Sequence, residues 1–295
     1  MRKTILLGLC SLLLTLNLAA QQDFSKVEMR VIKVAGSVYM LQGAGGNIGV
    51  SVFDDGFVVV DDQYAPLVPK IKEALKGITT KPMKFIINTH YHGDHTGGNA
   101  ILGQDAPIIA HDNVRKRLQS GATLFGQTTP PAAPAALPVI TFNDHATLYE
   151  KGEEIHLTHV PPGHTDGDTV VDFKTSRVVH MGDDFFNGMF PFVDLGNGGS
   201  VRGMLATVDA TVARIGDDTK VIPGHGELSD KAGLRAFADM LRGTLGAVQT
   251  AMKAGKNVEQ MKKENVLVRW ASWGKGFINT DHWIETLAEE LKKKK

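Results

Sequence analysis

The feature that most constrains this chain is a run of metal-binding side chains, HYHGDH, at residues 90–95. It places His90, His92, Asp94 and His95 directly after the short apolar segment Phe85–Ile87. One face of a strand or helix would not gather all four side chains, so we predict a loop that wraps them around an ion. Imidazole and carboxylate ligands without a cysteine favour Zn²⁺ in a site that stays open to a substrate.

Three later segments each add a side chain of the same kind just after a predicted strand. They are Pro161–Thr165 with His164, Met181–Asp183 with Asp183, and Pro223–Gly226 with His225. Strand ends are where α/β folds build their sites. Asp184 lies beside Asp183, and a turn cap is the alternative role for either carboxylate, but we take Asp183 as the ligand.

With these motifs in this order, the chain resembles the metallo-β-lactamase-fold superfamily of zinc hydrolases over roughly Val38–Glu227. The resemblance implies an α/β fold in four layers, an αββα sandwich with two Zn²⁺ ions per chain at one edge between the sheets. It implies one ion held by His90, His92 and His164, and a second held by Asp94, His95 and His225, with Asp183 as the bridge. Asp61, after the predicted strand Val58–Val60, matches an aspartate that supports the ligand loop from behind.

Two zinc ions would share a hydroxide, because metals lower its pKa toward neutrality. We therefore predict a hydrolase whose metal-bridging hydroxide attacks a small carbonyl-type substrate: a lactone, ester, thioester or β-lactam. Asp94 is the predicted catalytic residue, which orients the hydroxide and shuttles its proton. Two alternatives stay open, a dedicated β-lactamase and a non-catalytic periplasmic accessory or binding protein. Lactamases of the cysteine-containing subclasses have a cysteine at the position of Asp183, and most have a lysine at the position of Phe186. The ligand set therefore points away from a dedicated β-lactamase.

The segment after the predicted bridging aspartate is unusually rich in phenylalanine. We predict that Phe186 and Phe190 line an apolar substrate pocket, with Arg202 as an anion contact. The alternative is that Phe185, Phe186, Phe190 and Phe192 fill the core. No basic cluster follows Glu227, which disfavours glutathione thioesters as substrates.

Apolar periodicity outlines the remaining elements. Strands are predicted at Val38–Leu41, Ile48–Phe53, Phe57–Val60, Ile108–Ala110, Ile155–Val160, Thr169–Phe173, Arg177–Met181 and Lys220–Ile222. Helices are predicted from Pro66 to Gly77, after a Ser200 cap, and from Asp230 onward, the last beginning at Thr280 or Asp281. Thr128–Pro138 is predicted to be a surface loop or flap. We expect residues 21–295 to form one domain, with C-terminal helices from about residue 230. We expect Trp270, Trp273 and Trp283 to pack these helices onto the sandwich.

The N-terminus has the composition of a secretory signal. Arg2 and Lys3 precede the apolar run Thr4–Ala20, which is short for a membrane span. We predict a signal peptide at residues 1–20, a periplasmic or secreted mature protein and no stable membrane insertion, with an uncleaved anchor as the alternative. The only cysteine, Cys10, lies inside this run, so the mature chain would contain none.

Overall charge bears on the class of partner. Lys+Arg and Asp+Glu both number 32, so no net field attracts a polyanion, and we expect no nucleic-acid partner. The oligomeric state stays open. We expect the remaining histidines to be structural or exposed: His111, His145, His156, His159, His180 and His282.

Overall fold

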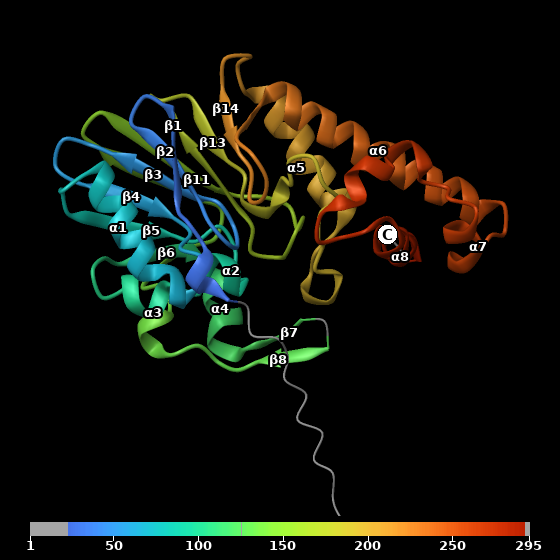
Figure 1. The fold of residues 1–295 in the computed structure, drawn as a ribbon, viewed down its shortest axis with the longest axis horizontal. Coiled ribbons are helices and arrows are strands. Elements are labelled where there is room, and N and C mark those ends of the chain that lie inside the picture. Colours follow the sequence, from blue (N-terminus) through green and yellow to red (C-terminus); the bar gives the residue numbers. More distant parts are fainter. Residues whose placement is uncertain (1–22, 125, 293–295) are drawn as a thin grey trace, which may run out of the picture.

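Two mixed β-sheets stacked face to face form the centre of the molecule in the computed structural model, which describes residues 23–124 and 126–292 (Figure 1). Helices cover the outer face of each sheet, giving the four-layer α/β sandwich that the motifs led us to expect. The predicted signal peptide lies outside the described residues.

The first sheet has seven strands in the order β1-β2-β3-β4-β5-β6-β9. Its antiparallel half is β1 (Arg30–Ala35), β2 (Val38–Gln42), β3 (Ile48–Val52) and β4 (Phe57–Val60). Its parallel half continues through β5 (Met83–Ile87), β6 (Ile108–His111) and β9 (Ile140–Phe142). The crossovers between parallel strands carry α1 (Val68–Ile78), α3 (Asn99–Leu102) and α4 (Asp112–Ser120).

The second sheet has six strands in the order β10-β11-β12-β13-β14-β15. They are β10 (His145–Glu150), β11 (Glu153–His159), β12 (Thr169–Phe173), β13 (Val178–His180), β14 (Lys220–Ile222) and β15 (Ser229–Asp230). Only β13 and β14 pair in parallel, and the crossover between them contains α5 (Val201–Arg214). Ser200 caps α5 as predicted, by accepting a hydrogen bond from the Gly203 amide at 3.2 Å.

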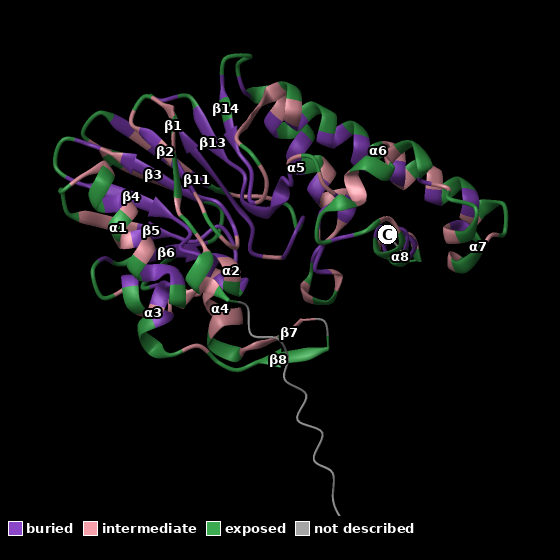
Figure 2. Cartoon of the chain, in the orientation of Figure 1, coloured by how far each residue is buried: buried purple, intermediate pink, exposed green. Residues whose placement is uncertain are grey.

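Alternation along the strands decides which side chains meet between the sheets. Val58 and Val60 of β4 belong to the core between the two sheets, whereas Val59 belongs to the cluster under α1 with Ile71. Successive strand residues point to opposite faces, so one strand serves both layers. Figure 2 shows the result in central strands such as β4 and β13, which are buried along their whole length.

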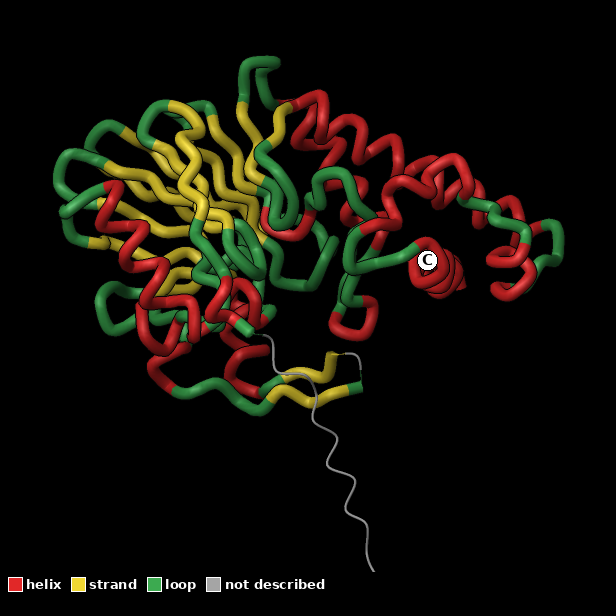
Figure 3. The backbone as a smooth tube through the Cα atoms, in the orientation of Figure 1, coloured by secondary structure: helices red, strands yellow, loops and turns green. Residues whose placement is uncertain are grey.

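Four helical segments follow the second sheet. They are α6 (Lys231–Lys253), α7 (Val258–Lys263), the 3-10 segment Val268–Lys275 and α8 (Thr280–Lys292) (Figure 3). Helix α6 lies against the β14–β15 edge of the sheet, and the other three pack on α6 and on one another (Figure 1). Trp283 is fully buried and stacks on Phe190 with ring centroids 5.6 Å apart. Trp273 lies against Phe237 at 6.2 Å. The prediction is confirmed for Trp283, whereas Trp273 packs on a residue of α6 and so joins the C-terminal helices to one another.

Some elements were not predicted from the sequence. Helix α4, strand β10 and a separate hairpin of β7 (Ala122–Leu124) and β8 (Gln127–Thr129) fall where apolar periodicity is weak. The predicted loop at residues 128–138 is correct in the main, although it starts inside β8 and contains a short 3-10 turn. Within the described residues, no helix is both long and apolar enough to cross a bilayer.

Candidate metal centre

The ligand motifs converge at one edge of the sandwich. His90 and His92 lie in the loop after β5, and this loop runs into α2 (Gly93–Thr96), which carries Asp94 and His95. The other three come from the second sheet: His164 follows β11, Asp183 lies in a 3-10 turn after β13, and His225 follows β14. Residues up to 135 positions apart in the sequence therefore meet because the strands before them end at the same edge.

The seven side chains fall into overlapping groups whose donor atoms all lie within 4.8 Å of one another. The groups are His90–His92–His164, His90–His95–Asp183 and Asp94–His95–His225. The first and third match the two ligand sets that the resemblance implied. Asp183 lies between them, with Oδ2 at 3.3 Å from His164 Nε2 and 3.4 Å from His225 Nε2.

Hydrogen bonds on the outer side of the imidazoles determine which nitrogen faces the centre. His164 Nδ1 donates to the Phe192 carbonyl at 2.8 Å, and His92 Nε2 donates to Asp194 Oδ2 at 3.1 Å. The lone pairs of His164 Nε2 and His92 Nδ1 then face each other at 2.7 Å. Two facing lone pairs repel unless a cation lies between them, so this pair fits a metal ion.

The next two rings are likewise oriented by contacts on their outer side. His95 Nδ1 donates to Asp61 Oδ2 at 2.7 Å, which leaves Nε2 free to face Asp183 Oδ1 at 3.0 Å. His90 Nδ1 contacts the Thr89 hydroxyl at 3.0 Å, while its Nε2 is buried and has no hydrogen-bond partner. A buried polar atom without a partner is costly in a protein interior. The donor set therefore fits divalent cations of the kind that nitrogen and oxygen ligands bind, such as Zn²⁺.

The imidazoles and carboxylates of the cluster shift one another's pKa values. Burial lowers the pKa of His164 to about 4, so this ring is neutral near pH 7. Burial opposes ionisation of Asp183, but His95, His225 and His164 together hold the pKa of Asp183 well below its usual value. Against burial, the same aspartate and Asp94 raise the pKa of His225 to about 9. Two carboxylates thus hold positive charge at this site, as a proton or as a metal ion.

Asp61 lies where a supporting residue was predicted. It is fully buried at the end of β4 and accepts hydrogen bonds from the Thr89 amide at 2.8 Å and the Thr89 hydroxyl at 2.7 Å, besides the one from His95. Its φ of 64° is in the left-handed region, which is uncommon for a residue other than glycine. Asp61 therefore fixes the ligand loop and the orientation of one imidazole together.

Asp194 is a functional residue that sequence reasoning missed. Its carboxylate is 4% exposed and accepts hydrogen bonds from His92 and from the Tyr91 hydroxyl. Asn197 donates to it through the side-chain nitrogen at 2.9 Å and the backbone amide at 3.2 Å. The only signal in the sequence is that Asp194 is the one acidic residue in the aromatic and glycine-rich stretch 185–203.

The other residues set aside in the sequence analysis have structural contacts. Asp184 points away from the centre, with Oδ1 at 3.3 Å from the His164 amide. His180 is buried and donates to the Asn47 carbonyl at 3.0 Å, and His111 stacks on His159 with centroids 3.7 Å apart. None of the six remaining histidines belongs to a candidate metal cluster among the described residues.

A cavity of about 320 Å³ opens directly over the cluster. Its walls are mainly apolar and aromatic: Gly45, Tyr64, Leu124, Phe186, Met189, Phe190, Phe192, Phe277 and Ile278. Phe186 and Phe190 thus line the pocket as predicted, and both are also buried in the core. Burial and the neighbouring Asp94 and Asp183 raise the pKa of Tyr64 to about 12, so its hydroxyl keeps its proton.

The prediction for Arg202 is wrong. It does not line the cavity; its guanidinium lies 3.5 Å from the buried carboxylate of Glu290 on α8. Its position on the first turn of α5 turns it toward the C-terminal helix, which no local pattern could reveal. Phe185 is also core rather than pocket, since it is fully buried and packs on Phe237 at 5.3 Å.

Comparison with known proteins agrees with this architecture. Residues 32–226 match the family model described as the metallo-beta-lactamase superfamily. A "Hydroxyacylglutathione hydrolase" of Polaromonas sp. is 33% identical over 48% of this chain and 47% of its own length. A "Probable metallo-hydrolase" of Methanocaldococcus jannaschii is 29% identical over 59% of this chain and 84% of its own. The chain thus spans only about half the length of the first of these relatives.

A solved metallo-β-lactamase from Pontibacter korlensis has the same fold, with a TM-score of 0.60 over 73% of this chain and 99% of that one. Its 17% identity supports the fold alone. The family match, in contrast, covers every ligand motif from His90 to His225. The chain belongs to the metallo-β-lactamase superfamily.

Proposed function

We propose that this protein is a zinc-dependent hydrolase, with two Zn²⁺ ions per chain, that cleaves small uncharged carbonyl compounds: esters, lactones or thioesters. One observation carries the proposal. The seven donor side chains lie beneath a cavity with aromatic walls, and no lysine or arginine is among its lining residues. Away from the metal site, such a cavity binds apolar groups and offers no ion pair to an anionic group of a substrate.

When bound, two zinc ions supply a nucleophile from water near neutral pH and polarise the scissile carbonyl. The protein's own groups then orient the reaction. His95 and His225 lower the pKa of Asp94 to about 2 against the effect of burial, so its carboxylate is ionised and can accept a proton at Oδ2. Tyr64 keeps its hydroxyl proton and can donate a hydrogen bond to a substrate oxygen. Asp94 is therefore the proton carrier that we assign to the leaving group.

The lining also weighs against the alternatives. Glutathione and the common β-lactam antibiotics carry carboxylates, and the described residues that line the cavity include no lysine or arginine to pair with a carboxylate remote from the metal site. One relative is a hydroxyacylglutathione hydrolase, but we do not assign the activity of that relative to this protein. A non-catalytic accessory role would not require a full donor set beneath an open cavity, so we place it last.

The test is a comparison of four substrates with zinc-loaded protein. We expect p-nitrophenyl acetate or a γ-lactone to be hydrolysed with kcat/KM of about 10⁴ M⁻¹s⁻¹ or more, in the range of working enzymes. A chromogenic cephalosporin and S-lactoylglutathione should be much poorer. Asp94→Ala should abolish turnover, whereas the surface variant Asp209→Ala should not. Higher activity on either anionic substrate would refute the proposed specificity, and no turnover of any substrate would favour a binding protein.

We also propose that the protein is exported to the periplasm or secreted. The proposal rests on the basic start and the apolar run of residues 4–20. Cell fractionation followed by N-terminal sequencing tests it, with a mature N-terminus after residue 19 or 20 as the expected result. Recovery of the uncleaved chain from the membrane fraction would support the anchor instead.

A further inference from the structure

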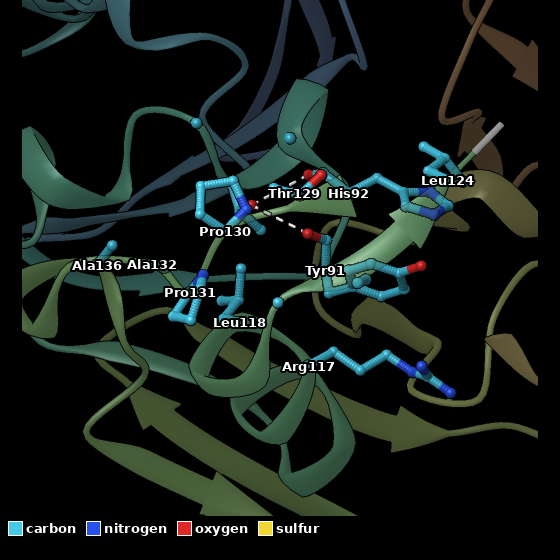
Figure 4. A pocket seen from close by; sticks show the side chains of 15 residues that line it. Tyr91, His92, Arg117, Leu118, Leu124, Thr129, Pro130, Pro131, Ala132 and Ala136 are labelled. Carbon is cyan, nitrogen blue, oxygen red and sulfur yellow. Dashed lines mark hydrogen bonds between the residues drawn. The ribbon is translucent and has the colours of Figure 1, made fainter. Parts of the chain in front are cut away.

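A second cavity of about 310 Å³ lies beside the metal cavity, beneath the β7–β8 hairpin (Figure 4). Its walls come from the ligand loop and α2, from α4, from the hairpin and from the proline-rich segment that follows it. His92 and Leu124 line both cavities, so the two meet at a metal-site imidazole. Neither the ligand set nor the proposed reaction uses this second space.

The walls of this second cavity are apolar. They include the Tyr91 ring and the side chains of Leu118, Ala122, Pro131 and Ala132. Figure 4 shows Tyr91, Leu118 and Pro131 around one common space. Its volume is at the lower end of ligand pockets, which run from about 300 to 1,000 Å³, and suits one alkyl or aryl group better than a whole substrate.

Among the described residues that line this cavity, the one arginine or lysine side chain is already paired. Arg117 donates to both carboxylate oxygens of Asp166 at 2.6 Å, and to the side-chain and backbone oxygens of Asn197 at 2.9 and 2.8 Å. An anionic group would have to compete with this two-point ion pair for the guanidinium. The cavity therefore favours an uncharged group.

Hydrogen bonds hold the hairpin and the segment that follows it in place around the cavity. The Ala132 amide donates to the Leu118 carbonyl at 2.8 Å, and Asn197 Nδ2 donates to the Thr123 carbonyl at 2.9 Å. At Gly121 the φ is +75°, and a Cβ would lie 2.4 Å from the Thr129 carbonyl, so only glycine allows this close approach. These contacts make the cavity a preformed part of the fold.

We propose that this cavity is a substrate subsite that holds an uncharged alkyl or aryl arm while the scissile carbonyl lies over the metals. The inference rests on the proposed hydrolase function and narrows its substrate class to esters, thioesters or lactones with one medium-length apolar arm. The arm passes His92 and Leu124 on its way from the metal cavity. Each buried methylene is worth about 0.8 kcal/mol, or roughly fourfold in affinity, so several of them produce a measurable preference.

The test compares p-nitrophenyl octanoate with p-nitrophenyl acetate on zinc-loaded protein. We expect kcat/KM to be at least tenfold higher for the octanoate ester than for the acetate ester. Ala132→Phe places a ring in the cavity and should remove the preference through KM, with the acetate ester changed less than about twofold. Ala133→Phe is the matched control, since Ala133 is exposed and does not line the cavity. Leu118→Ala, which enlarges the space, should move the preferred chain toward decanoate.

A binding measurement separates failure of the subsite from failure of the proposed function. Isothermal titration of octanoate and acetate into zinc-loaded protein should show octanoate binding at least tenfold more tightly, and Ala132→Phe should remove the difference. Absence of ester turnover with this binding result would refute the hydrolase proposal while supporting the subsite. An octanoyl preference that persists in Ala132→Phe, or no difference between the two acids, would overturn the subsite.

Discussion

Replacing Asp194 by asparagine is expected to weaken one metal site selectively. The carboxylate lies 3.1 Å from His92 Nε2, and both side chains are 5% exposed. Asparagine keeps the size but loses the charge, and its amide nitrogen would face donors, since Asn197 already donates to both carboxylate oxygens at 2.9 Å. A hydrogen bond to a charged group is worth about 1.5–3 kcal/mol. That energy equals roughly 10- to 150-fold in a binding constant.

The structure therefore predicts that Zn²⁺ affinity falls by about 10- to 100-fold at the site formed by His90, His92 and His164, as losses of such supporting partners typically do. Affinity at the other site should change by less than about threefold. Competition with a chromophoric chelator measures both constants, and circular dichroism verifies folding. Asp209→Asn, at an exposed ion pair with Arg242, is the matched control and should change neither constant. Unchanged affinity at both sites in a folded Asp194→Asn protein would refute the role that we assign to this residue.

Three further predictions concern stability and pH. Asp61→Asn should lower the free energy of unfolding of the metal-free protein by about 1–3 kcal/mol, because one amide oxygen cannot replace three carboxylate contacts; an unchanged urea midpoint would contradict this. Gly203→Ala should lower Tm, since its Cβ would lie 1.8 Å from the Pro162 carbonyl oxygen. Gly246→Ala, where the new Cβ meets open space, should stabilise the protein by up to about 1 kcal/mol. Equal changes in Tm for the two variants would argue against the clash at Gly203. The pKa of His225 is about 9, so below that pH zinc must displace a proton from this imidazole. Zinc affinity should therefore rise with pH by up to about tenfold per unit between pH 6.5 and 8.5. A zinc affinity that does not change with pH in chelator titrations would contradict this prediction.

Local patterns were enough to identify most of the strands and all of the candidate ligands. Alternating and continuous apolar runs predicted β4 and β5, because a buried strand needs apolar side chains wherever it is placed. His90, His92, Asp94 and His95 could be identified together, because they sit on one short loop and its first helical turn. Periodicity failed for β10 and for the β7–β8 hairpin, where the side chains are half-exposed or exposed and carry no regular apolar pattern.

The sequence by itself determined the chemistry of this protein: the types of ligand, their attachment to strand ends and the apolar character of the segment beyond Asp183. Only the tertiary structure decided which residues support and surround them. Asp194 meets His92 across 102 positions of the chain, and Arg202 turns to Glu290 across 88 instead of facing the cavity. Phe277 and Ile278 reach the cavity wall from the loop that precedes α8. Such contacts depend on how distant elements pack, and packing leaves no periodic signal in the segments that it joins.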